Sequence, residues 1–187
     1  MLEGGSIAIL LTMTLGIPAA EPLPPVLPIR TVQVGQAPDD QAGGVARIVG
    51  GLIGYAHWPQ PKSRIAICTL GATRFSRRLG EAGAVAGLPV ATRALPSGDA
   101  ATIQGCDLLY LGAMPADQRL RAIRAVHGQP IMSVDEASPD CRSGAMFCLA
   151  ARGDAITFRL NIDAISRSQV RVDPRVLRLF SGDGASS

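Results

Sequence analysis

Four cysteines constrain the fold of this 187-residue chain more than any other feature. In a small exported domain an even number of cysteines indicates disulfide bonds, and four of them allow three pairings. Cys148 follows Cys141 by only seven positions, and a serine and a glycine between them permit a turn, so a local bond is favoured. That bond leaves Cys68, inside one apolar segment, to reach Cys106 at the start of another.

Other uses of the cysteines fit the spacing less well. Structural zinc sites normally place their ligands in pairs about two to four residues apart, whereas the four cysteines are 38, 35 and 7 positions apart. Thioredoxin-like chemistry needs a Cys-x-x-Cys pair, which the sequence lacks. Four reduced thiols in a cytosolic protein are the other alternative, and the cellular compartment decides between that state and two disulfides.

The N-terminus has the pattern of an export signal. Ile7 to Ile17 form an apolar run of eleven residues, and small residues follow up to Ala20. Secretory signals contain an apolar region of this kind, whereas a membrane-spanning helix needs about 20 residues. A positively charged start is missing, because Glu3 is the only charged side chain before the run. We expect a signal peptide over residues 1–20 and an exported mature chain.

Proline and glycine content divides the rest of the chain into three parts. Residues 21–44 hold five prolines and several glycines, which is typical of a flexible leader. A folded domain is expected over residues 45–180, followed by a flexible tail over residues 181–187. This length suits one domain of about 100–150 residues with terminal extras. Because aromatic residues make up only 4% of the chain, the core must be aliphatic.

The apolar pattern of the domain predicts alternating helices and strands. A first helix carries its apolar face from Val45 onward, with Asp39 or Asp40 as its cap and Trp58, before a proline, as its end. Strands are expected at residues 64–71, 88–95, 106–112 and 130–136, a hairpin at 145–161, and further helices at 73–82, 116–128, 162–168 and 173–180. Three of these helices have the expected caps Thr73, Asn161 and Asp173. We therefore predict a single α/β domain with a mixed sheet of about five or six strands, flanked by helices and stapled by disulfides.

The sequence contains no motif that would make the chain an enzyme. His57 and His127 are the two histidines, and each lies at a predicted helix end. His127 stands in the last turn of its helix, where a positive charge interacts favourably with the helix dipole, so a capping role is expected. A Gly-x-Ser-x-Gly elbow, a phosphate loop and a dinucleotide fingerprint are all missing. We expect no enzymatic activity and no catalytic, cofactor-binding or metal-binding residues.

The charge of the chain argues against a nucleic-acid partner. The formal net charge is only +3, from 17 arginines and one lysine against 15 acidic residues, whereas nucleic-acid-binding domains carry a strongly basic patch. Arg171, Arg175 and Arg178 are spaced so that they could share one exposed face. Such a face is either simply solvated or an anchor for an acidic partner.

Several short motifs follow one another in an order that resembles a known family. The order is Tyr55-x-x-Trp58-Pro59, ICTLG with Cys68, CDLLYLG with Cys106, SVDE at residues 133–136, the pair Cys141 and Cys148, and FRLNIDAI at residues 158–165. Each motif is short, but their order and the cysteine spacing resemble the YfiR family of bacterial periplasmic proteins over about residues 40–180.

This resemblance implies a repressor without catalytic activity. Members of the family are exported α/β proteins that tend to dimerise, and their best-known role is to hold a membrane-bound diguanylate cyclase inactive by binding its periplasmic region. Less cyclic di-GMP is then made inside the cell. For this chain the resemblance implies the disulfides Cys68–Cys106 and Cys141–Cys148, a homodimer, and no membrane-spanning segment after removal of the signal peptide.

The sequence leaves the partner and its binding surface open. A membrane-bound sensor kinase is an alternative target to a cyclase, and no residues indicate where either would bind. Loss of a disulfide would loosen the repressor, so that oxidation state is a candidate input. A different class of function is a sensor of a small ligand or a cell-wall fragment, with its pocket at the strand ends of the sheet.

Overall fold

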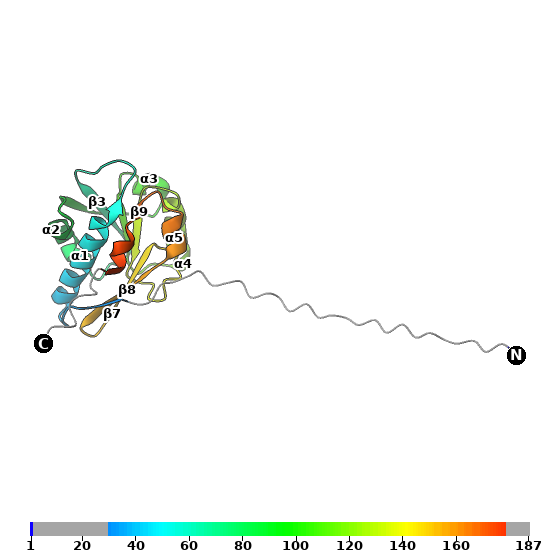
Figure 1. Cartoon of the computed structure of the whole chain (residues 1–187), viewed down its shortest axis with the longest axis horizontal. Coiled ribbons are helices and arrows are strands. Elements are labelled where there is room, and N and C mark those ends of the chain that lie inside the picture. Colours follow the sequence, from blue (N-terminus) through cyan, green and yellow to red (C-terminus); the bar gives the residue numbers. More distant parts are fainter. Residues whose placement is uncertain (2–29, 179–187) are drawn as a thin grey trace.

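The main element of the fold is a mixed sheet of seven strands (Figure 1). The computed structural model describes Met1 and residues 30–178, so the predicted signal peptide after Met1 and the predicted tail lie outside the described residues. The strands are β1 (Arg30–Gln33), β3 (Ile65–Leu70), β4 (Val90–Ala94), β5 (Leu108–Leu111), β6 (Met132–Asp135), β7 (Phe147–Arg152) and β8 (Ala155–Leu160). Their order across the sheet is β1-β8-β7-β6-β5-β3-β4.

The centre of the sheet is parallel and one side is antiparallel. Strands β4, β3, β5, β6 and β7 run in the same direction, whereas β8 is antiparallel to β7 and β1 is antiparallel to β8. A second, two-stranded sheet joins β2 (Ala56–His57) to β9 (Arg171–Val172). The prediction of a single α/β domain with a mixed, disulfide-stapled sheet is confirmed, with seven strands in the main sheet instead of five or six.

The additional strand comes from the segment predicted to be a leader. Strand β1 begins at Arg30 and helix α1 (Pro38–Gly54) begins at Pro38, so the structure places the start of the domain at Arg30 and not at residue 45. Four of the five leader prolines precede β1, and Pro38 lies in the first turn of α1, where a missing amide loses no hydrogen bond. Proline content therefore does not distinguish a linker from a strand followed by a helix start.

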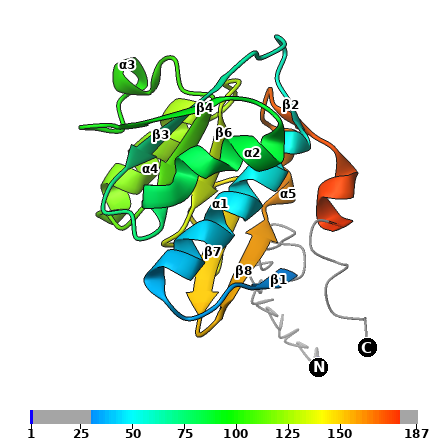
Figure 2. The same cartoon turned by 90° about the vertical axis from the view of Figure 1, so that its left-hand side faces the viewer.

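Helices cover both faces of the sheet, as Figure 2 shows. Helix α1, the 3₁₀ helix η1 (Ser76–Glu81) and α2 (Ala82–Ala86) cover one face, and α3 (Ala100–Ile103) and α4 (Ala116–Val126) cover the other. In β5, Leu108 and Tyr110 pack on the α1 side, and Leu109 and Leu111 pack on the α4 side. A strand buried on both faces is continuously apolar, which explains why the CDLLYLG segment was predictable as a strand.

Helix α1 packs closely against its neighbours through glycine. A Cβ atom at Gly50 would lie 2.5 Å from the carbonyl oxygen of Ala82, so a larger residue does not fit without movement of α2. The helix ends at Gly54, earlier than the predicted end at Trp58, because the chain turns at Tyr55 to form β2.

The helix caps were predicted with mixed success. Asp39 and Asp40 lie in the first turn of α1 instead of capping it. Their negative charges interact favourably with the positive end of the helix dipole. The Thr73 hydroxyl bonds to Ser76 at 2.6 Å and caps no amide. Asn161 does cap α5 (Ile162–Ser166), because its Oδ1 atom accepts a hydrogen bond from an amide of the first turn at 3.0 Å. The last predicted helix is a 3₁₀ helix, η2 (Pro174–Arg178).

Candidate functional site

The first disulfide joins β3 to the chain just before β5. Cys68 and Cys106 have sulfur atoms 1.93 Å apart and Cα atoms 5.8 Å apart. Both side chains are buried on the face of the sheet that α3 and α4 cover. Arg93 of β4 donates to the carbonyl oxygen of Gln104 at 2.9 Å and lies 3.4 Å from the sulfur of Cys106. The disulfide therefore ties β3 to the segment that follows α3, and Arg93 ties the edge strand β4 to the same segment.

The second disulfide closes the loop between β6 and β7. Cys141 and Cys148 have sulfur atoms 2.01 Å apart, and Cys141 adopts a positive φ of 59°, which few residues other than glycine adopt. Both cysteines are buried and pack with Ala145 against Ile123 of α4. Ile123 also packs against the cluster that contains the first disulfide. Helix α4 therefore covers both disulfides, and the described residues include no free cysteine.

A buried ion pair lies at the carboxyl end of β6. The Asp135 carboxylate is completely buried, and Arg119 of α4 donates to both of its oxygens at 2.5 Å. Arg119 also donates to the carbonyl oxygen of Gly112 at 3.1 Å, and the amide of Ala137 donates to Asp135 at 2.8 Å. A buried charge is tolerated only when it is paired and hydrogen-bonded. These bonds fix the start of α4 to the ends of β5 and β6.

The next residue, Glu136, connects three segments of the chain. Its carboxylate accepts hydrogen bonds from the amides of Arg74 and Phe75, just before η1, and from the hydroxyl group of Tyr110 at 2.7 Å. Burial, together with the charge of Glu136, raises the pKa of Tyr110 well above its usual value. Arg74 in turn donates to Gln41 of α1 at 3.0 Å. The SVDE segment is therefore where the helices of both faces are bonded to the sheet.

At the position where an open α/β sheet usually binds a ligand, two loops are bonded to each other, and a hollow of about 450 Å³ lies beside them at the ends of β3 and β4. Such sheets bind ligands at the carboxyl ends of two neighbouring strands whose connections leave in opposite directions, which here are β3 and β5. After these strands, Ala72 and Ala113 each donate an amide to the other's carbonyl oxygen at 2.9 Å. A Cβ atom at Gly112 would lie 2.4 Å from the carbonyl oxygen of Ala72. The two loops fill the space between these strand ends.

A hollow of about 500 Å³ lies beside the two-stranded sheet. It contains Trp58, whose indole nitrogen is buried without a hydrogen-bond partner among the described residues. The exposed side chains of His57 and Arg171 also line it. Near this hollow, hydrogen bonds from the side chain and amide of Arg175 lower the pKa of Asp173 to about 2. Among the described residues, Arg171 gives this hollow a positive charge, and the tryptophan in its wall has a buried indole N–H group without a partner.

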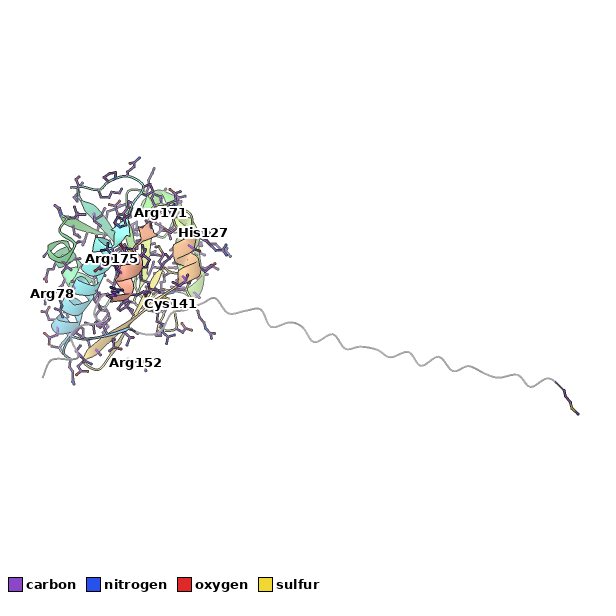
Figure 3. All side chains as sticks on the ribbon, viewed as in Figure 1. Arg78, His127, Cys141, Arg152, Arg171 and Arg175 are labelled. Carbon is purple, nitrogen blue, oxygen red and sulfur yellow. A yellow bond between two sulfur atoms is a disulfide. The ribbon has the colours of Figure 1, made fainter. Side chains whose placement is uncertain are left out.

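The arginines of the last third of the domain lie in separate places on the surface. Figure 3 shows Arg152 at the tip of the β7–β8 hairpin, away from Arg171 and Arg175. The side chain of Arg175 is engaged by Asp173, with nitrogen and oxygen 2.7 Å apart. The two histidines also lie apart, with His57 in β2 and His127 directly after α4. In the described part of the chain, no group of three or more His, Cys, Asp or Glu residues is arranged to hold a metal ion.

The sequence indicated the disulfides but missed the carboxylates. Asp135 and Glu136 belong to the SVDE segment, which was noted only as part of a motif. A usable signal was present, because two successive acidic residues stand at the end of a predicted strand.

Within residues 30–178, no helix has the length and apolar character needed to cross a membrane.

Comparison with protein families gives a match over most of the domain. The family model described as YfiR/HmsC-like matches residues 44–180, which is well over half of the chain. The chain belongs to the YfiR/HmsC-like family. The YfiR/HmsC-like range includes both disulfides, the SVDE segment and the hollow beside Trp58, whereas strand β1 precedes it.

Solved structures are only weakly similar. O-acetylhomoserine sulfhydrylase from Wolinella succinogenes is 12% identical with a TM-score of 0.44, over 71% of this chain and 41% of its own. Phosphoserine aminotransferase from Cytophaga hutchinsonii is 11% identical with a TM-score of 0.44, over 74% and 42%. Cysteine desulfurase from Thermococcus onnurineus is 9% identical with a TM-score of 0.46, over 74% and 39%. The chain spans about two fifths of each of these proteins, and we draw no functional conclusion from them.

Proposed function

We propose that this protein is an exported repressor that binds the periplasmic region of a membrane-bound diguanylate cyclase and holds it inactive. The observation that carries the proposal is the YfiR/HmsC-like match over residues 44–180. The two disulfides support it, because disulfides persist in oxidising compartments such as the periplasm. The repressor itself catalyses no reaction, acts as a homodimer and lowers the amount of cyclic di-GMP inside the cell.

The interior of the domain suits a protein that acts by docking. Two disulfides, the pair Asp135–Arg119 and the bonds of Glu136 tie the helices to the sheet from both sides. A binding surface that is already ordered loses less conformational entropy when its partner arrives. Reduction of either disulfide would loosen α4, which covers both, and this gives the oxidation state a route to control of the partner.

Deletion of the gene tests the repressor role. Cyclic di-GMP should rise in the deletion strain and return to its starting level when the full chain is supplied from a plasmid. A chain without residues 1–20 is the matched control, because it should stay in the cytoplasm and fail to restore the level. An unchanged level after deletion contradicts a cyclase as the target, and restoration by the cytoplasmic form contradicts a periplasmic site of action.

The hollow beside Trp58 favours a second candidate function, the sensing of a small anionic ligand. The cation of Arg171 would attract a carboxylate or phosphate such as those of cell-wall fragments, and a shift of the Trp58 ring would be needed to expose its buried, unpaired indole N–H group to that ligand. A ligand of the folded state raises the melting temperature by mass action. Muropeptides should therefore raise it for the wild type and less for Trp58→Phe, which keeps a ring but removes the donor. Absence of any shift in the wild type contradicts this candidate.

A further inference from the structure

Strand β4 leaves one edge of the main sheet open. Within residues 30–178 it is the last strand in the sheet order and pairs only with β3 (Figure 2). The amide of Ile65 donates to the carbonyl oxygen of Pro89 at 2.9 Å, and the amide of Leu95 donates to that of Thr69 at 2.8 Å. Because backbone groups alternate along a strand, Ala91 and Arg93 also face β3. The amide and carbonyl groups of Val90, Thr92 and Ala94 therefore face outward.

The side chains of β4 do little to block this edge. Natural edge strands are protected by charged residues, bulges or a covering element, because their free backbone groups can pair with another strand. From Ala91 to Ala94 every residue of β4 is exposed, and Arg93 is the only charged one. The guanidinium of Arg93 is directed back to its own subunit, where it donates to the carbonyl oxygens of Thr102 at 3.2 Å and Gln104 at 2.9 Å.

The segment is self-complementary, which indicates a second copy of the chain as the partner. With a two-fold axis at Thr92, an antiparallel pair brings Thr92 opposite itself and Val90 opposite Ala94 of the other copy. The three outward-facing residues on each side then exchange amide and carbonyl hydrogen bonds. Arg93 lies opposite Ala91, so the pairing places no like charges directly against each other. Pro89 and Pro96 bracket the strand and limit the pairing to the residues between them.

We propose that β4 forms the dimer interface of this protein by antiparallel pairing with β4 of a second copy, which joins two seven-stranded sheets into one. The inference goes beyond the proposed function, which includes a dimer but no interface, and it does not depend on the identity of the signalling partner. Addition of a strand to an open sheet edge is a common mode of recognition, in which main-chain hydrogen bonds supply the affinity.

Substitution of Thr92 by proline tests the interface. Proline removes an outward-facing amide and no bond to β3, so the edge strand tolerates it. Sedimentation equilibrium should show a dimer for the wild type and a dissociation constant at least about tenfold higher for Thr92→Pro, which corresponds to about 1.4 kcal/mol. The matched control is Thr92→Val, which keeps the amide and should leave the dimer intact. Circular dichroism and the melting temperature establish that each variant is folded.

Cross-linking gives an independent readout if the proline variant does not fold. A hydrogen-bonded antiparallel pair has Cα atoms about 5.5 Å apart, which suits a disulfide. Thr92→Cys should form a covalent dimer under mild oxidation, whereas Gln104→Cys, also exposed but outside the strand, should not. A monomeric wild type overturns the proposal, as does failure of Thr92→Cys to cross-link or a dimer that persists in folded Thr92→Pro. None of these results decides whether the protein represses a cyclase, because repression is read from cyclic di-GMP; a monomeric wild type would contradict only the homodimer of the proposed function.

Discussion

At the scale of single residues, the buried carboxylate of Asp135 is the most demanding group in the described structure. Its side chain is 0% exposed, and Arg119, at 14% exposure, supplies the balancing charge. Removal of one partner from a buried pair leaves an uncompensated charge and costs about 3–5 kcal/mol. We therefore expect Arg119→Met, which keeps the aliphatic length, to lower the free energy of unfolding by about that amount. Urea unfolding at pH 7 measures it.

A second arginine on the same helix provides the control. Arg121 pairs with Asp117 at 2.8 Å, but both side chains are largely exposed, where water screens the interaction. Arg121→Met should therefore change the stability little. Combining Arg119→Met with Asp135→Asn removes the buried charge and should recover part of the loss. Equal losses for the two single arginine variants would contradict the importance of the buried pair.

The buried hydroxyl group of Tyr110 predicts a dependence of stability on alkaline pH. Burial and the charge of Glu136 raise the pKa of Tyr110 in the folded state. Above about pH 10 the unfolded chain loses this proton while the folded chain keeps it, so the free energy of unfolding falls by about 1.4 kcal/mol per pH unit. Tyr110→Phe should reduce this slope. Unfolding of both proteins between pH 8 and pH 11 checks it, and parallel slopes would refute the assignment.

Single-residue roles were predictable only where the partner was close in sequence. Asn161 was identified as a cap because its partner amide is three residues away. The partner of Asp135 is 16 positions distant and the amides that bind Glu136 are 61 and 62 positions distant. Nothing in the local pattern identifies such partners, because only the folded sheet brings them together.

At the scale of elements, the two disulfides should differ in their contribution to stability. Cys68 and Cys106 close a loop of 38 positions, and Cys141 and Cys148 close one of 7. Loop-closure entropy then assigns about 4 kcal/mol to the first bond and about 2.5 kcal/mol to the second. We expect the double alanine variant of the first pair to lose more stability in urea unfolding than that of the second.

The comparison of these two variants is matched because each replaces two buried cysteines by alanine on the same face of the sheet. The wild type without reductant is the reference. If the short loop proves the more important, chain entropy is not the main contribution of these two bonds to stability.

Helices and strands were predicted best where the sequence has a clear apolar pattern. Strands β3, β5 and β6 are short apolar runs between turns, and each was predicted close to its place. Segments η1 and η2 were predicted as α-helices, because a stretch of five or six residues gives no pattern that separates a 3₁₀ turn from an α-helical one. Strand β1 was missed because its four residues directly follow a proline-rich segment, although Thr31 and Val32 favour strands.

At the scale of the whole molecule, the two edges of the main sheet are formed by strands with different neighbours along the chain. At one edge, β1 is the outer strand; it pairs with β8 and continues into α1. At the other edge, β4 is open and available for a second copy. Pairing of β4 with β4 of a second copy about a two-fold axis uses the same strand on both copies, so it is complete with two copies and leaves only β1 at the two outer ends. This arrangement gives a closed dimer instead of a growing sheet.

Removal of β1 tests whether this first strand belongs to the folded unit. Val32 and Val34 pack against the core, and the amide of Val34 donates to the carbonyl oxygen of Asp154 at 2.7 Å. Full burial of a valine contributes about 1.5–3 kcal/mol, and both side chains are only half-buried. A chain that begins at Pro38 should therefore unfold with about 2 kcal/mol less free energy than one that begins at Arg30.

The truncated chain should also aggregate more readily, because β8 becomes an uncovered edge. Urea midpoints and light scattering measure the two effects. The control is a chain that begins at Glu21, which should match the one beginning at Arg30, since it adds residues that precede the strand. If the chains beginning at Pro38 and Arg30 are equally stable and equally soluble, then β1 contributes nothing to the domain. The edge of β8 must in that case be protected by another part of the chain.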